Sequence, residues 1–544
     1  ERVERFLEGP CGIEWQIRRG IMDDGWWCEM STNYNQWCAE MFTEVGLALE
    51  KWGVSMLKKK YPAVYHEGTK SYAEPGKAVK AKIPKSGIYP AVWGPSYRNY
   101  RRIKDLYYSV IPLISEDGKL PGLNDARAEK KAERFDLAFY AFGDEEFLQY
   151  CSGRNLLYPV DADKIEAAKN KAENELLPST IADNAGVAML RSQGVDSPRE
   201  QYQALLSYGS HGGHHGHWDR LNLTYLRRFG KLATQNRTAW FSYNNHMYQM
   251  YVQTSVAHSM VIVDGKNQYP APSDRLLYHT GELFQAVAVE NESRWSNPRF
   301  AGGLGYSKEE KEAGEFETLG GTVSIPENPP EPGHMTDFTE PILARRLMAV
   351  TDDYVLVVDY AKGEQEHSFD LLYQFEGFEG FNDAADVKLV EEREKYDPSP
   401  LRAGQFIKNC KIYRVRGAVR ANFKSKSLNI DVHTAWPGER EHMIGDSPGC
   451  PGRHKVINET YSAGRTRGRK ASFVSLIELQ EDQTNRQVSS VTAEGPERVR
   501  VELNDGRVHR WQVSGLKAED ASPAVDISLV EECPDGTTRK ENAQ

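Results

Sequence analysis

The segment of this sequence best suited to chemistry is a run of histidines and glycines at residues 209–221. Four of the 14 histidines fall within seven positions there. His215 and His217 are two residues apart, so on an extended segment both side chains point to one face, as metal ligands or as neighbours lining a cleft. The plain alternative is a solvated loop. The glycines, which allow close approach of the backbone, and Asp219, which can orient an imidazole, favour a functional site.

Two further segments carry polar or aromatic residues of interest. Residues 257–265 place His258 at the beginning of an apolar run, where a single histidine is more often structural than a ligand. Residues 24–37 gather polar and aromatic side chains immediately before a strong helical pattern. This second segment fits two roles equally well: a helix N-terminus capped by Asn33 or Asn35 with tryptophans as packing, or a carbohydrate-binding surface.

The elements that position these segments fall into two classes. Over roughly the first 200 residues, apolar residues recur at intervals of three and four, which predicts helices with buried stripes. The stripes are Trp37, Met41, Val45, Leu49 and Trp52; Tyr97, Tyr100, Ile103, Tyr107 and Val110; and Phe135, Ala138, Phe139 and Phe142. Residues 163–177, rich in Ala, Lys and Glu, predict an exposed helix.

After about residue 183, short β-branched runs separated by Gly, Asp and Pro predict many antiparallel strands in large stacked sheets. Residues 499–513, with Asn-Asp-Gly in the middle, predict a hairpin, and residues 309–332 predict a long surface loop. The fold class expected is α+β and multidomain. The expected parts are a helical region at 1–182, a central β-sandwich at 183–390 and a C-terminal β-sheet region at 391–544.

Composition excludes several classes of function. Lys and Arg number 68 against 78 Asp and Glu, and the net charge of −10 argues against nucleic-acid binding through a basic surface. No apolar run approaches the roughly 18 residues of a membrane-spanning helix. Seven scattered cysteines without a CxxC pair argue against a disulfide framework and a thiolate zinc site. The chain begins at Glu1 without a leader pattern, which predicts a mature or trimmed chain.

Together the three segments resemble the heparinase II/III-type polysaccharide lyases, which include heparinase II, heparinase III and the oligoalginate lyases. Residues 215–223, followed by 229–232, are similar to that group's HGHxDxLS…GxxL pattern. Residues 257–265 are similar to its AHNTVVVDG strand, and residues 24–35 to its DG…YH stretch. The resemblance extends over about residues 20–380.

The resemblance implies an N-terminal helical (α/α) toroid followed by antiparallel β-sandwich sheets. Only 23 residues precede the DG segment, so the toroid is expected to be incomplete. The implied reaction is β-elimination on a uronic-acid-containing anionic polysaccharide of the alginate, ulvan, glycosaminoglycan or glucuronan class. A periplasmic or secreted bacterial enzyme is expected.

The resemblance also implies residue roles. Tyr89, 54 residues after Asn35, matches the catalytic acid/base, while Asn35 and His215 match the groups that neutralise the substrate carboxylate. Many members have His at the position of Asn35, and this departure favours an acid/base mechanism that depends on tyrosine alone. The residues expected to contact substrate are Tyr34, His211, Tyr243 and Tyr248.

A structural zinc is the cofactor that the resemblance implies, with His217 and His258 as two ligands. The third ligand position, an Asp in relatives, falls at residues 234–236, which are Thr-Gln-Asn. Two other functions stay open. One is a non-catalytic glycan-binding relative, and the other is a zinc-dependent hydrolase using the histidines between 211 and 217, which no HExxH pattern accompanies.

Overall fold

The computed structural model describes most of the chain, apart from one long segment and several shorter ones. The positions outside the description are 1, 63–99, 128, 210–214, 235–246, 270, 272, 298–311, 314, 319–320, 325–336, 383–386, 399–401, 426–427, 436–437, 453–454 and 483–484. Three predicted site residues, Tyr89, His211 and Tyr243, therefore lie outside the described residues.

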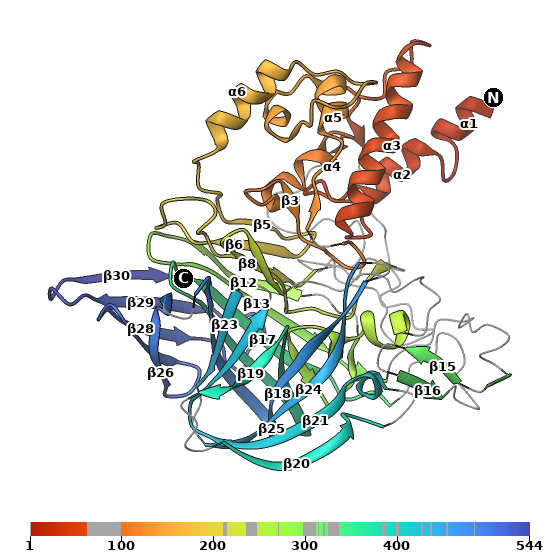
Figure 1. Cartoon of the computed structure of the whole chain (residues 1–544). Helices are drawn as coiled ribbons and strands as arrows, with labels where there is room; N and C mark the ends of the chain where they lie inside the picture. Colours follow the sequence, from red (N-terminus) through yellow and green to blue (C-terminus); the bar gives the residue numbers. More distant parts are fainter. Residues whose placement is uncertain are drawn as a thin grey trace.

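Helices gather in the N-terminal part of the chain, at the top of Figure 1. The α-helices are α1 (Arg2–Glu8), α2 (Ile13–Gly20), α3 (Thr32–Glu50), α4 (Asp105–Tyr108), α5 (Phe135–Phe142) and α6 (Ala162–Ala172). The 3₁₀ turns η1 (Ile111–Leu113) and η2 (Glu145–Tyr150) and two small hairpins complete this part. The hairpins pair β1 (Tyr61–Pro62) with β2 (Tyr100–Arg101) and β3 (Lys119–Leu120) with β4 (Lys130–Lys131).

The predicted helical toroid is not supported. Among the described α-helices only α3, with 19 residues, is long, and the others have 4 to 11 residues. In the described part of the stripe before Pro112, Tyr100 lies in β2, Tyr107 lies in the single turn α4 and Val110 lies just before η1, so these residues do not form one long helix. These helices share one apolar core with a face of the first sheet, so they form a small helical cap on that sheet.

The helix predicted from the first stripe is confirmed as α3, but the face predicted to be buried is wrong. Trp37 is 54% exposed and Trp52, just past the helix end, is 83% exposed. The buried face instead carries small or polar residues together with Phe42. The reason is close packing: an added Cβ on Gly46 would lie 2.4 Å from Leu57, so the face with small residues approaches its neighbours most closely. The helix α5 agrees with prediction, and α6 is the predicted exposed helix but ends at Ala172 and not at residue 177.

The first sheet is an antiparallel meander of five strands in chain order. Its strands are β5 (Thr180–Ala182), β6 (Val187–Arg191), β7 (Gln203–Ser207), β8 (Asn222–Arg228) and β9 (Lys231–Thr234). Alternate residues of β6 serve different cores: Val187 and Met189 face the helical cap, whereas Ala188 and Leu190 face the next sheet. Because both faces are covered, every residue of β6 and β8 is buried.

The second sheet has twelve strands, in the order β12-β13-β17-β18-β25-β23-β22-β19, with β10 on β18 and with β24, β21 and β20 joined through β25. The strands are β10 (Val261–Val263), β12 (Ser273–Thr280), β13 (Gln285–Ser293), β17 (Ile342–Val350), β18 (Val355–Phe375), β19 (Phe378–Asn382), β20 (Val387–Lys395), β21 (Lys408–Arg416), β22 (Val419–Ser425), β23 (Leu428–Thr434), β24 (Glu439–Gly452) and β25 (Lys455–Gln480). The pair of long strands β18 and β25 forms its centre.

Two small antiparallel pairs lie outside the large sheets. One joins β11 (Asn267–Gln268) to β14 (Trp295–Ser296). The other joins β15 (Glu315–Thr318) to β16 (Gly321–Ser324). The second pair lies within the segment predicted to be a loop, so that segment contains a short hairpin.

The third sheet has five strands in chain order at the C-terminus. They are β26 (Val488–Ala493), β27 (Arg498–Leu503), β28 (Val508–Ser514), β29 (Asp526–Glu532) and β30 (Thr538–Ala543). The predicted hairpin is confirmed as β27 and β28. A core that contains Leu347 and Trp511 joins this sheet to the second one.

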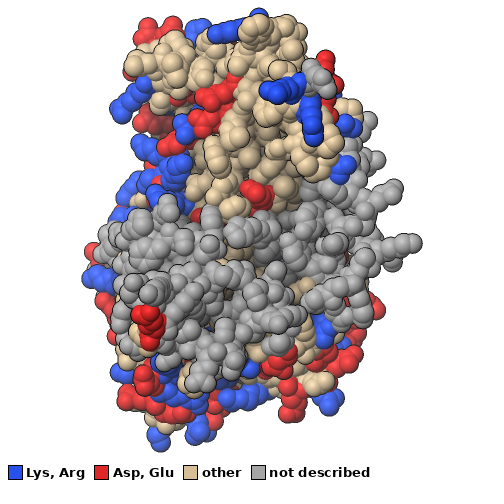
Figure 2. All heavy atoms as spheres, turned by 90° about the vertical axis from the view of Figure 1, so that its right-hand side faces the viewer, with Lys and Arg blue, Asp and Glu red and all other residues tan. Residues whose placement is uncertain are grey.

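The layered β-sheets bear out the predicted β-sandwich character. The predicted domain boundary at residue 182 falls at the end of β5, the first strand of the first sheet, and the one at residue 390 falls inside β20. None of the described helices is long and apolar enough to span a membrane. On the face shown in Figure 2, basic and acidic side chains are intermixed over the described surface.

Candidate functional site

The DG segment forms a tight loop between α2 and α3. Gly25 has a φ of +88°, and a Cβ at this position would lie 2.5 Å from the carbonyl oxygen of Asp105. Only glycine fits such a backbone without strain. Asp24, the residue before Gly25, accepts a hydrogen bond from the backbone N–H of Ala185 at 2.9 Å. This bond ties the loop to the first sheet.

Asn35 holds this loop from inside α3. Its Oδ1 accepts from the Trp27 N–H at 2.7 Å, and its Nδ2 donates to Leu106 O at 2.7 Å and to Ser109 Oγ at 3.2 Å. The side chain is 0% exposed. In the described structure Asn35 therefore positions the loop, and contact with a substrate carboxylate stays a prediction.

The neighbouring residue, Tyr34, points to a different place. Its ring lies against the imidazole of His215, with ring centroids 4.1 Å apart and planes inclined by 30°. Nδ1 of His215 lies 2.8 Å from Oδ2 of Asp125, and its Nε2 lies 4.0 Å from Glu29. Two predicted residues from distant segments thus meet, together with two carboxylates that the sequence analysis did not assign.

Asn124 joins the three segments that meet here. Its Nδ2 donates to the carbonyl oxygens of Glu29 and Met30, each at 3.2 Å, and its Oδ1 accepts from the backbone N–H of His217 at 3.1 Å. Asn124 adopts a φ of +52°, a conformation that asparagine tolerates in turns. The Asn-Asp pair at 124–125 has only this turn chemistry as a sequence signal, which is why both residues were missed.

The electrostatics of this cluster favour a charged imidazole. Burial alone lowers the pKa of His215, but the hydrogen bond to Asp125 and the charges of Asp125 and Glu29 outweigh burial, so the pKa is raised above its ordinary value. The side chain of Asp125 is 0% exposed, which shields this pair from solvent. His215 can therefore present a positive charge to an anionic group.

A hollow adjoins Tyr34 on the outer side of α3. Its volume is about 230 Å³, and it is lined by polar residues of α3, among them Glu40, and by charged residues of both signs at and after β4. Its lining residues are Asn33, Tyr34, Gln36, Trp37, Glu40, Lys130, Glu133 and Arg134. Tyr34 thus lies between His215 and an open, polar hollow.

Tyr248 lies on the inner side of the cluster, in the π-helical turn η4 (Tyr248–Val252). Its ring is edge-on to His217, with centroids 6.2 Å apart, and its side chain is buried. Burial, and then the charge of Asp125, raise the pKa of Tyr248 well above its ordinary value. Tyr248 is thus a neutral hydroxyl inside the site, and its predicted contact with substrate stays a prediction.

His217 and His258 meet as the metal prediction requires. Nδ1 of His217 lies 3.0 Å from Nε2 of His258. Nδ1 of His258 lies 2.7 Å from the carbonyl oxygen of Thr254. Because a carbonyl only accepts, this nitrogen carries the proton and Nε2 presents a lone pair. Oδ2 of Asp219 lies 3.9 Å from that Nε2, but these three side chains do not bring their ligand atoms within 4.8 Å of one another, so the structure brings together two of the donors that zinc would need.

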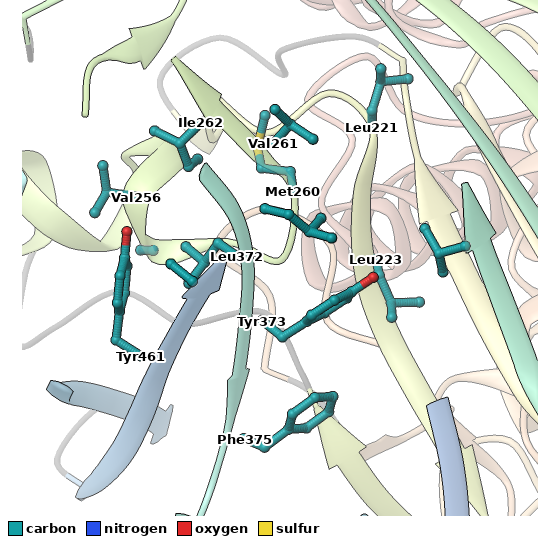
Figure 3. Close-up of a cluster of buried hydrophobic side chains, with 14 of the residues drawn as sticks. Leu221, Leu223, Val256, Met260, Val261, Ile262, Leu372, Tyr373, Phe375 and Tyr461 are labelled. Atoms are coloured by element: carbon teal, nitrogen blue, oxygen red, sulfur yellow. The ribbon is translucent and has the colours of Figure 1, made fainter. Parts of the chain in front are cut away.

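The strand after His258 is fixed by the central core (Figure 3). Val261 and Ile262 of β10 pair with β18, and Met260 and Leu372 pack beside them. The buried guanidinium of Arg346 donates to the carbonyl oxygens of Leu221 and Ser259, each at 2.7 Å. The histidine segment and the His258 segment are thereby held side by side.

The comparisons with known proteins bear on fold alone. No family model matches the sequence, and no curated protein matches it. A heparan sulfate lyase, HepC from Pedobacter heparinus, matches over 96% of this chain, with a TM-score of 0.50 at 11% identity, and a mutant of it matches with a TM-score of 0.51. This chain shares its fold with a heparan sulfate lyase. A heparinase III matches over 81% of the chain with a TM-score of 0.46.

The shared fold confirms the predicted β-sandwich. The chain spans 59% of the length of the heparan sulfate lyase it matches.

Proposed function

We propose that this protein is a polysaccharide lyase that cleaves a uronic-acid-containing anionic glycan by β-elimination and leaves 4,5-unsaturated uronate ends. The observation that carries the proposal is His215, which is hydrogen-bonded to Asp125 and lies in ring contact with Tyr34, a residue that lines an open hollow. The fold shared with a heparan sulfate lyase supports the same reaction class.

The reaction makes three demands on a site. A base must remove the proton from C5 of the uronate, the C4–O bond must break as the C4–C5 double bond forms, and the leaving oxygen must receive a proton. The C5 proton is weakly acidic until the neighbouring carboxylate is neutralised. A cationic His215 would neutralise this carboxylate, because it stabilises the negative charge that develops there when the C5 proton leaves.

Tyr89 is the proposed acid and base, on the strength of the sequence resemblance. As phenolate it would accept the C5 proton, and as phenol it would protonate the leaving oxygen. Asn35 would act with His215 through the loop that it holds, since its amide hydrogen bonds keep Trp27 and the residues after it in place. Tyr34, His211, Tyr243 and Tyr248 would contact the sugar chain.

We further propose that His217 and His258 hold a structural zinc. Its role would be to brace the segment that carries His215, and no step of the reaction depends on it. Because a polymeric glycan does not cross membranes, we propose that the enzyme acts in the periplasm or outside the cell.

The test is the ultraviolet absorbance of the conjugated enoate while purified protein acts on alginates, ulvan, glycosaminoglycans and glucuronans. Heparan sulfate is the first candidate because the structure with the shared fold is a heparan sulfate lyase. We expect one polymer to give a rising signal, and Tyr89→Phe and His215→Gln each to reduce the rate by about 100-fold or more.

The matched control is His279→Gln. His279 is also a partly buried histidine paired with a carboxylate, Glu541, but it lies on β12, away from the cluster. Saturable binding without absorbance would replace the proposal with a glycan-binding function. Saturated products whose formation stops with a chelator and resumes with zinc would replace it with a hydrolase.

A further inference from the structure

A second set of ligand-type side chains lies in the large sheet, away from the proposed lyase site. Asp431 and His433 are two residues apart on β23, so their side chains share a face, and Glu478 on β25 lies directly opposite Asp431 in the antiparallel register. One ligand atom from each residue falls within 4.8 Å of the others. Among the described residues this is the one group of three or more such side chains that meets this distance.

The imidazole of His433 makes this more than an acidic cluster. The residue is 6% exposed, and its buried Nε2 has no hydrogen-bond partner in the described part of the chain. A buried polar atom without a partner costs about 1–3 kcal/mol. A cation bound through this nitrogen would supply the missing partner.

Glu478 is a buried acidic side chain that lacks an ion pair within the described chain, just as Nε2 of His433 lacks a hydrogen-bond partner there. It is 0% exposed, its carboxylate accepts the backbone N–H groups of Gln487 and Val488, and no ion pair joins it to a described cation. A buried carboxylate without a counter-charge is costly. The two N–H donors orient the group and leave further lone pairs on its oxygens for another ligand bond.

Asp431 is already oriented by its neighbours. Oδ1 accepts from Asn422, and Oδ2 accepts from Gln480 at 3.1 Å and from Arg486 at 2.7 Å. Such outer hydrogen bonds are typical of carboxylates that bind metals, because they fix the direction of the ligand oxygen. Arg486 forms its ion pair with Asp431, and Glu478 has no direct ion pair among the described residues.

We propose that Asp431, His433 and Glu478 together bind one divalent transition-metal ion, and that zinc suits them best. An imidazole nitrogen with two carboxylate oxygens is a zinc donor set, whereas calcium and magnesium prefer oxygen ligands alone. Because Glu478 also holds Gln487 and Val488, where β26 begins, the ion would fasten the second sheet to the third (Figure 1). This site is independent of the lyase proposal.

The test counts zinc ions on the full chain after chelator stripping, reloading and dialysis, with circular dichroism as the check on folding. We expect His433→Gln and Glu478→Gln each to bind one equivalent fewer than the unmodified protein. Glu478→Gln keeps one oxygen that can accept from Gln487, whereas its amide nitrogen cannot accept from Val488, so the circular dichroism check matters most for this variant. His258→Gln reports separately on the other proposed zinc pair.

The matched control is His442→Gln. His442 is buried on β24 of the same sheet and also has one ring nitrogen without a hydrogen bond, but it belongs to no such ligand group among the described residues. It should bind as much zinc as the unmodified protein.

A second measurement needs no variant. Zinc added to the stripped unmodified protein should slow amide hydrogen exchange at Gln487 and Val488. Equal zinc content in all variants, or no zinc-dependent protection at these amides, would overturn the proposal and leave a proton shared between Glu478 and His433 as the explanation of their proximity.

Discussion

Nδ1 of His215 lies 2.8 Å from Oδ2 of Asp125, although 90 residues separate them in the chain. The contact joins the helical cap to the connection between β7 and β8. Because the carboxylate can only accept, Nδ1 carries its proton, and Nε2 is the atom whose protonation changes with pH. The charge that His215 presents to an anionic ligand therefore depends on Asp125, a residue of the helical cap.

Asp125→Asn should shift the pH dependence of anion binding to lower pH. In the folded protein the pKa of His215 is raised above 6.5, so the cation and its contribution are complete below 6.5 and are lost as pH rises through the raised pKa. Asparagine keeps the shape of the side chain but removes the charge that favours the imidazolium. The measurement is a proton NMR titration of His215 alongside the affinity for a uronate oligosaccharide at each pH.

Glu29→Gln is the control for this prediction. Glu29 lies 4.0 Å from Nε2 of His215 and is partly exposed, so its removal should shift the titration less than removal of Asp125. Identical titration curves for the unmodified protein and Asp125→Asn would show that Asp125 does not set the charge of His215.

The sequence predicted features that depend on local patterns. The helix containing Asn35, the β27–β28 hairpin and the antiparallel sheets follow from apolar periodicity and turn residues, and all are present. The motif segments also led to Tyr34 and His215, which lie in contact. Short-range patterns were sufficient for these elements because apolar periodicity and turn residues act locally.

The sequence could not predict relationships that depend on tertiary packing. Asp125 lies in a turn with no apolar period, and only the folded chain shows that it reaches His215. The prediction of which face of α3 is buried was wrong. Periodicity identifies a helix, but it does not decide between an aromatic face with Trp37 and a small-residue face with Gly46. The prediction of a toroid rested on the family resemblance and not on the length of the apolar stripes.

Asn35→Ala should destabilise the fold by about 2–4 kcal/mol. The substitution leaves the Trp27 N–H and the Leu106 carbonyl without their buried partner. Asn33→Ala is the matched control, because Asn33 is on the same helix but half-buried beside the open hollow, and a change within about 0.5 kcal/mol is expected. Urea unfolding measures both, and equal losses of stability would mean that the Asn35 amide does not hold the loop.

Asp24→Asn should flatten the dependence of stability on pH between about 4 and 6. Burial is the main cause that raises the pKa of Asp24 from 3.8 to about 6. The folded state thus binds this proton more tightly than the unfolded state, so the unmodified protein loses roughly 3 kcal/mol as pH rises through that window. Chemical unfolding at several pH values tests this, with Asp163→Asn on exposed α6 as the control. The same slope in Asp24→Asn as in the unmodified protein would contradict the assignment.

Gly25→Ala should be more destabilising than Gly53→Ala, although both glycines have positive φ. Gly53, at +76°, has no atom within 4 Å of an added Cβ, so its substitution isolates the backbone cost of about 1–2 kcal/mol. At Gly25 the same Cβ would also lie 2.5 Å from the Asp105 carbonyl oxygen, and relieving that overlap adds about 1–3 kcal/mol. Denaturant unfolding of the two variants gives the difference directly. If they lost equal stability, the loop would have room for a side chain, and its contact with α4 would not restrict residue 25 to glycine.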